Sequence, residues 1–194
     1  MTPLMFEVRR KFIHLIPLLI PLVSTFDILN KQELLVVAGI STLIAFALDL
    51  SRMRRGFISK VFFQLFGTFL RPSEKSALTG STYYLLGIFL AILIFPKPIA
   101  EASMYILIIG DTMAAFVGIM WGRTKIWGKS LEGSLAFLIS SCAILALLGR
   151  VGLWVAVTGA LVATVVELLP LSINDNLTIP ISSGVSMYLV YYLF

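Results

Sequence analysis

The stretch Gly110–Ser134 reads GDTMAAFVGIMWGRTKIWGKSLEGS and lies between two apolar runs of the chain. It combines carboxylates, basic residues and glycines at a place where a simple membrane anchor needs only a short loop. Ionisable residues that border or enter a hydrophobic segment are costly there and are usually kept for a function. The stretch therefore predicts two membrane helices with a functional site at their junction.

The overall composition is that of a membrane protein. Hydrophobic residues make up 59% of the 194 positions, charged residues only 13%, and the mean hydropathy is +0.99. These values exceed what a soluble core requires. We therefore expect an all-α, polytopic transmembrane bundle that forms a single domain over residues 1–194. Runs close to the roughly 20 residues that span a bilayer predict about seven transmembrane helices, at 12 to 29, 33 to 50, 78 to 95, 100 to 120, 134 to 149, 151 to 170 and 177 to 194.

Basic residues set the expected orientation. One set of alternate loops holds 12 of them and the other holds Lys31, Lys97 and Arg150, which together are the 15 in the sequence. The richer side of a helical membrane protein is the cytoplasmic one. The N-terminus is therefore predicted to face the cytoplasm, in a multi-pass protein of the cell membrane. The same bias accounts for the net charge of +5, so nothing in the charge requires nucleic acid as a partner.

Two features of the predicted cytoplasmic side follow from its contact with the bilayer. Topology is the favoured explanation of the basic cluster Arg52, Arg54, Arg55 and Lys60, and the alternative is that it holds anionic lipid headgroups or a polyphosphate. The apolar but interrupted segment 57–70 is expected to form an interfacial amphipathic helix.

Asp111 lies inside a predicted span. A charged residue there costs at least about 2.5 to 3.5 kcal/mol, so it normally faces a bundle interior or a wet cavity. Gly110, Ala114 and Gly118 recur every four residues and form a face that allows close helix packing. We therefore expect Asp111 at a helix contact, with a functional role favoured over a carboxylate that pairs with an arginine for assembly.

Gly128-Lys129-Ser130 suggests a phosphate-binding loop, but it is not a P-loop. That motif needs a glycine where this chain has Arg123, and it follows a strand, whereas a membrane helix is predicted here. The chemistry for phosphate is still present, because Ser130 can cap the next helix and Lys129 with Arg123 or Lys125 can neutralise phosphate oxygens. The alternative is a solvated loop with one capping serine.

Asp175-Asn176-Leu-Thr-Ile-Pro180 has the signature of a second helix start, with Asx residues at the cap and proline in the first turn. Glu167 lies just upstream. Capping explains one of the two Asx residues, whereas carboxylates and amides together suit a hard cation such as magnesium. Metal or nucleotide contact and plain capping are equal alternatives at this point.

Most ionisable residues gather on the predicted cytoplasmic side, and no matching set is expected on the other. Arg10, Lys11 and His14 share one face of the first helix, because their spacings are three and four. His14 is the only histidine, which excludes a His-rich metal site. It is a candidate base, a phosphate donor or an interfacial residue.

These residues form an ordered set that resembles the polyprenol kinase family, which includes dolichol kinase, phytol kinase and a CTP-dependent diacylglycerol kinase. The matching motifs are Arg10-Lys11-x-x-His14, Arg71-x-x-Glu74 with Thr79-Gly80, Gly110-Asp111, Gly128-Lys-Ser-x-Glu132-Gly-Ser and Asp175-Asn-Leu-Thr-Ile-Pro. The resemblance covers nearly the whole chain. It implies a membrane phosphotransferase that uses CTP and Mg²⁺ to phosphorylate an isoprenoid alcohol such as dolichol, a polyprenol or phytol, at the cytoplasmic face. Phosphoryl transfer needs positioning and charge stabilisation more than covalent chemistry, which scattered Asp, Asn, Lys and Arg can supply.

On this resemblance we assign roles to the site residues as a hypothesis. The catalytic set is Asp111, His14, Lys129 and Glu132. Asp111 or His14 would take the hydroxyl proton, and Glu132 would orient Lys129 or bind metal. Magnesium is expected on Asp111, Asp175 and Asn176. The nucleotide is expected to contact Arg10, Lys11, Arg71, Glu74, Arg123, Lys125, Gly128, Lys129, Ser130 and Asn176.

Three other functions are compatible with the sequence. A CTP-dependent diacylglycerol kinase differs only in its acceptor. A cytidylyltransferase would make a CDP-lipid and release pyrophosphate instead of CDP. A small transporter would also place a carboxylate such as Asp111 within glycine-rich helices, although no inverted repeat is evident.

Overall fold

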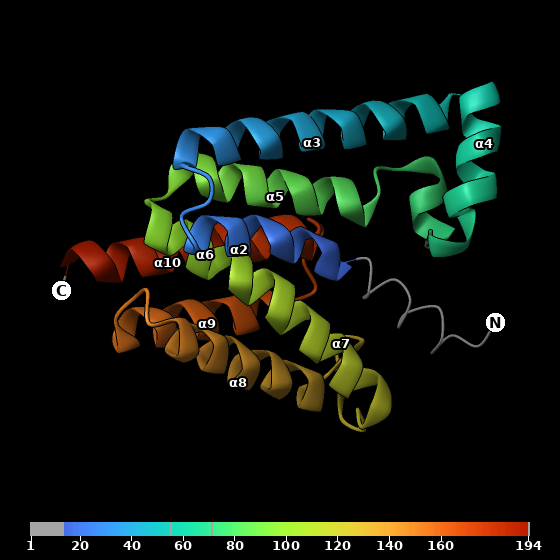
Figure 1. The fold of residues 1–194 in the computed structure, drawn as a ribbon. Coiled ribbons are helices and arrows are strands. Elements are labelled where there is room, and N and C mark those ends of the chain that lie inside the picture. Colours follow the sequence, from blue (N-terminus) through green and yellow to red (C-terminus); the bar gives the residue numbers. More distant parts are fainter. Residues whose placement is uncertain (1–13, 55, 71, 194) are drawn as a thin grey trace.

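The computed structural model describes residues 14–54, 56–70 and 72–193, and these form a helical bundle, as predicted (Figure 1). The helical elements, in chain order, are η1 (Ile16–Leu18), α2 (Leu19–Thr25), α3 (Lys31–Met53), α4 (Phe57–Phe66), η2 (Gly67–Phe69), η3 (Pro72–Ser76), α5 (Gly80–Ile94), α6 (Lys97–Tyr105), η4 (Ile106–Gly110), α7 (Asp111–Met120), α8 (Leu131–Leu148), α9 (Leu153–Leu168) and α10 (Asp175–Leu193).

Successive neighbours line up across the bundle as α3, α5, α10, α9, α8 and α7, and α6 packs against both α5 and α10. The core lies where α5, α6, η4 and α10 meet. Tyr84, Ile88, Ile106, Ile179 and Met187 are fully or almost fully buried there. Over the described residues the buried side chains form one cluster, and the single-domain organisation remains a prediction.

Outer helix faces are apolar as well as exposed. On α3, Val36, Ile40 and Leu43 are more than half exposed, which is the pattern of a surface that contacts lipid. Three helical segments are long and apolar enough to cross a membrane, namely Lys31–Met53, Lys97–Met120 and Leu131–Leu148. Ile16–Thr25, Gly80–Ile94 and Leu153–Leu168 are apolar but shorter. The count of about seven spans and the orientation of the N-terminus remain predictions.

The segment Lys97–Met120 is one continuous helix with a π-helical turn, η4, in its middle. A π-turn accommodates an extra residue and often occurs at functional sites. Asp111 is the first residue after it. The predicted interfacial segment 57–70 contains α4 and the short turn η2, and α4 lies across the end of α3 (Figure 1).

A short hairpin departs from the all-helical expectation. Strands β1 (Lys125–Ile126) and β2 (Lys129–Ser130) pair in antiparallel register between α7 and α8. The two residues at its tip, Trp127 and Gly128, have φ angles of 49° and 86°. Two positive φ angles are what a tight hairpin turn of this twist requires, and glycine adopts them readily. Gly128 is therefore needed for the turn itself.

The bundle end that carries the α2–α3 and α8–α9 connections contains a polar cluster that the sequence did not predict. Ser24 donates a hydrogen bond to the buried Glu101 (2.6 Å), Lys97 binds Asp27, and Arg150 donates to the main-chain oxygen of Thr25. The Lys97 ammonium lowers the pKa of Asp27, chiefly through this hydrogen bond. The expectation that this side lacks a matching polar set is therefore wrong, because its charged residues tie α2, α6 and the α8–α9 connection together.

Candidate active site

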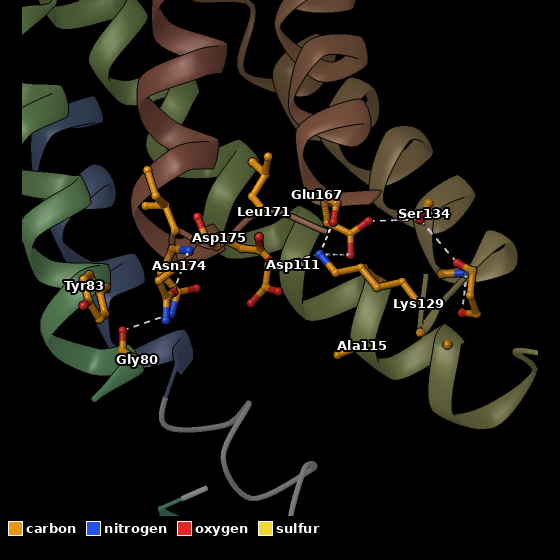
Figure 2. Close-up of a pocket in the computed structure, with 18 of the residues that line it drawn as sticks. Gly80, Tyr83, Asp111, Ala115, Lys129, Ser134, Glu167, Leu171, Asn174 and Asp175 are labelled. Carbon is orange, nitrogen blue, oxygen red and sulfur yellow. Dashed lines mark hydrogen bonds and ion pairs between the residues drawn. The ribbon is translucent and has the colours of Figure 1, made fainter. Parts of the chain in front are cut away.

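A cleft of about 800 Å³ lies at the other end of the bundle, where α5 and α7 to α10 meet (Figure 2). Residues from four of the five predicted motifs line it. They include Glu74, Gly80, Asp111, Lys125, Gly128, Lys129, Ser130, Glu167, Asp175 and Asn176. The structure thus brings together site candidates that are far apart in the sequence, the first being Glu74 and the last Asn176.

Lys129 is held between two carboxylates that also line the cleft, those of Asp175 and Glu167. Its Nζ donates to Asp175 Oδ2 at 2.6 Å and to the main-chain oxygen of Glu167, and lies 3.4 Å from Glu167 Oε1. Ser134 donates to the other carboxylate oxygen of Glu167 at 3.0 Å. Figure 2 shows the Lys129 chain reaching across the cleft toward Asp175. The lysine thereby joins the start of α8 to α9 and α10.

Ser130 caps α8, as predicted. Its hydroxyl accepts from the main-chain N–H of Gly133 at 3.1 Å. The helix approaches α7 so closely that a Cβ on Gly118 would lie 2.7 Å from Ser130 Oγ, and one on Gly133 would lie 2.7 Å from the Ala114 carbonyl oxygen. The predicted small-residue face of α7 is therefore a real helix contact.

The N-terminus of α10 is tied to that of α5. Asn176 donates from Nδ2 to the main-chain oxygen of Gly80 at 3.0 Å, and the main-chain N–H of Gly80 donates to Glu74 Oε1 at 2.8 Å. Two details of the predicted helix start are wrong. Asn174, one residue earlier, accepts from the N–H of Asn176 in the capping position, and Pro180 lies inside the helix, beyond its first turn.

Asp111 lines the cleft directly after the π-turn. Figure 2 shows its side chain between the Asn174–Asp175 segment and Lys129. Among the described residues, the lining contains the carboxylates Glu74, Asp111, Glu167 and Asp175, but only the ammonium groups of Lys125 and Lys129. This excess of negative charge would repel a bare triphosphate, so a phosphate ligand requires an accompanying cation or further basic residues.

The remaining predicted site residues have other positions. His14 is buried against the Tyr84 ring, with centroids 5.1 Å apart, and does not line the cleft. Glu132 accepts from the main-chain N–H of Thr124 at 3.0 Å and so braces the hairpin. Arg123 is exposed just before β1 and also lies outside the lining. Arg10, Lys11 and Arg71 fall outside the described residues.

Asp49 and Arg52 are the residues that the sequence interpretation missed. Arg52 was attributed to membrane topology, yet it is 2% exposed and forms a salt bridge of 2.8 Å with the equally buried Asp49. A signal was available, because Asp49 lies within the predicted span 33 to 50. The argument that singled out Asp111 applies to it unchanged.

The cleft offers carboxylate and amide oxygens, which are the ligands that magnesium prefers, and the metal itself remains a prediction. The described part of the chain has no group of three or more His, Cys, Asp and Glu residues placed to hold a metal. Magnesium is commonly held by one or two carboxylates together with substrate phosphates, without a full protein cage. Asp111, Asp175 and Asn176 line one cleft and offer such partial ligation.

Comparison with known proteins gives the family. No protein-family model and no solved structure matches this chain. Uncharacterized protein RP860 of Rickettsia prowazekii is 33% identical over 198 residues, which cover 97% of this chain and 96% of that protein. The chain belongs to the same family.

More distant relatives of this chain have names that state an activity. CTP-dependent diacylglycerol kinase 1 of Schizosaccharomyces pombe is 28% identical over 180 residues, or 83% of each chain. The protein of that name in Saccharomyces cerevisiae is 29% identical over 133 residues, which cover 67% of this chain but 46% of the yeast protein. These relatives support a place for the family among CTP-dependent lipid kinases, which are phosphotransferases with an alcohol acceptor.

Proposed function

We propose that this chain transfers the terminal phosphate of CTP to the hydroxyl group of a membrane lipid alcohol, in the cleft at the α8 and α10 N-termini. The observation that carries the proposal is the placement of Lys129, Asp175 and Asp111 around one cleft, in a chain whose relatives are named CTP-dependent kinases. The nucleotide would enter from the cytoplasm and the lipid from the bilayer.

In the reaction the acceptor oxygen forms a bond to the terminal phosphorus as the bond from that phosphorus to the bridging oxygen breaks, and CDP leaves. Asp111 is the base that the geometry favours over His14, because it lines the cleft. Its carboxylate would accept the hydroxyl proton. Magnesium, when bound, supplies positive charge to the phosphate oxygens.

Lys129 would stabilise the same oxygens from the start of α8. The capped N-terminus of this helix adds N–H groups and a favourable dipole for an anion. To reach phosphate, the ammonium must exchange at least one of its contacts with Asp175 and Glu167, which leaves Asp175 available to the metal.

The acceptor is the finer part of the proposal. The resemblance in the sequence favoured an isoprenoid alcohol, whereas the relatives' names give diacylglycerol for those proteins. We propose diacylglycerol as the acceptor for this chain and dolichol or phytol as its competitors. Each offers one hydroxyl on an apolar body, so the same chemistry serves all three.

The test uses purified protein in mixed micelles with Mg²⁺, terminally labelled CTP or ATP, and a panel of these alcohols. The proposal expects labelled phosphatidate with CTP, release of CDP, and loss of labelling in Asp111→Asn and Lys129→Ala proteins that insert normally. Release of pyrophosphate with a cytidine-containing lipid would mean a cytidylyltransferase instead. Full activity of both variants would show that the site is elsewhere.

A further inference from the structure

We propose that Asp49 and Arg52 are positioning residues for the cleft, and that they act by fixing the segment 74–80 and, through it, Glu74 and Asn176. The inference rests on the proposed function for its kinetic readout. It concerns residues that lie outside the cleft lining and that no predicted motif includes.

Arg52 donates hydrogen bonds to main-chain carbonyl groups at the end of η3 and just after it. Its guanidinium donates to the carbonyl oxygens of Glu74 (2.7 Å), Lys75 (3.2 Å) and Ala77 (2.6 Å). It also lies 5.4 Å from the centre of the Phe62 ring. One side chain from the end of α3 therefore holds α4 and the segment before α5 together.

Asp49 binds the same segment further along the chain, so that Asp49 and Arg52 together form a clamp on residues 74–80. One carboxylate oxygen accepts from the Arg52 guanidinium at 2.8 Å, and the other accepts from the N–H of Thr79 at 2.7 Å and the hydroxyl of Thr82 at 2.7 Å. Thr79 is also the N-cap of α5. The carboxylate thus fixes the place where α5 begins.

The clamp is linked to the cleft by two hydrogen bonds in sequence. Glu74 accepts from the N–H of Gly80, and the oxygen of Gly80 accepts from Asn176. Space is tight at this junction, since a Cβ on Gly80 would lie 3.1 Å from Glu74 Oε1 and 3.3 Å from Asn176 Nδ2. A shift of the segment would therefore displace one wall of the cleft.

Packing does little to order residues 75–77, the exposed part of this segment. Lys75, Ser76 and Ala77 are exposed, so little apolar burial opposes the conformational entropy of the chain. A buried ion pair is not in itself a means of gaining stability, because apolar residues of similar volume often serve as well. What it provides here is a fork of donors with fixed geometry, which arginine offers and lysine does not.

The experiment compares Arg52→Gln with Arg54→Gln, a change in an exposed arginine two residues away. If loss of the clamp leaves the segment ordered in about one molecule in ten, the apparent affinity falls tenfold. We expect KM for CTP to rise at least tenfold in Arg52→Gln while kcat changes less. Arg52→Lys should recover part of the loss, and Arg54→Gln should match the parent.

A second readout is independent of turnover. In a Cys142→Ser background, a spin label on Ser76→Cys should be clearly less mobile in the parent than in Arg52→Gln, because Ser76 is exposed and its mobility reflects the order of the main chain. Where Arg52→Gln does not fold, Thr82→Val removes a single bond to Asp49 and should give smaller changes of the same kind.

Each outcome separates the two proposals. If Arg52→Gln has the same label mobility and the same KM as the parent, and only its melting temperature is lower, the positioning role is wrong. If the label becomes more mobile in Arg52→Gln but the parent itself does not turn over CTP, the clamp is supported and the proposed function is refuted.

Discussion

Replacement of Gly133 by alanine should reduce activity far more than stability. The added Cβ would lie 2.7 Å from the Ala114 carbonyl oxygen, whereas ordinary contacts begin at 3.4 Å, so α7 and α8 must part by about 0.7 Å. Overpacking of this kind costs about 1 to 3 kcal/mol. Alanine recovers about 1 kcal/mol of helix propensity, which leaves a net cost of about 0 to 2 kcal/mol.

Because α7 begins at Asp111 and α8 follows Lys129, parting of the two helices would also move Asp111 relative to Lys129. A misplacement near 1 Å can cost about a hundredfold in rate, so we expect a fall in kcat of about 10- to 100-fold. The assay is CTP-dependent lipid phosphorylation, with melting temperature measured in the same detergent. Gly152→Ala is the matched control, because no atom lies within 4 Å of its added Cβ. A Gly133→Ala protein that keeps kcat within twofold of the parent would refute the view that this close contact sets the site.

Three further outcomes are expected. Lys129→Gln should lower kcat/KM at least a hundredfold, Lys129→Arg should restore part of it in the same labelled-CTP assay, and equal activity of both variants would contradict a charge role. Removal of divalent cations with EDTA should abolish turnover and added Mg²⁺ should restore it; turnover that persists in EDTA would exclude the metal. Asp27→Asn, at the opposite end of the bundle, should leave turnover unchanged. Because Lys97 holds the pKa of Asp27 below its ordinary value of 3.8, the small difference in melting temperature between this variant and the parent should be present at neutral pH and vanish as pH falls through the lowered value.

Local chemistry in the sequence predicted part of the site. Ser130 was correctly identified as a helix cap, because serine directly before a helical run commonly accepts a hydrogen bond from a main-chain N–H of the first turn. Gly110, Ala114 and Gly118 were correctly predicted to form a close helix contact. Asp111, which follows Gly110, lines the cleft, and its functional role remains a prediction. The sequence also predicted that Lys129 and Asp175 belong to one site, and the structure places them 2.6 Å apart.

Other features depend on tertiary pairing and were not predictable from local patterns. Arg52 resembles any cation at a membrane surface until the carbonyl groups of residues 74 to 77 are seen around it. Glu101 lies in a predicted span like Asp111, but its partner Ser24 comes from a distant helix. The hairpin was missed because a tryptophan at positive φ gives no turn signal in the sequence.

The π-turn Ile106–Gly110 affects how this helix can vary among relatives. An α-helix advances about 100° for each residue, so deletion of one residue from the turn would rotate everything after it by about that angle. Glu101 would keep its contacts at one end of the bundle, while Asp111 would point away from the cleft at the other. The extra residue therefore rotates the second half of the helix relative to the first, so that Glu101 and Asp111 can each face their own partners at opposite ends of the bundle. In alignments, an inserted or missing residue here should accompany a changed position of the carboxylate.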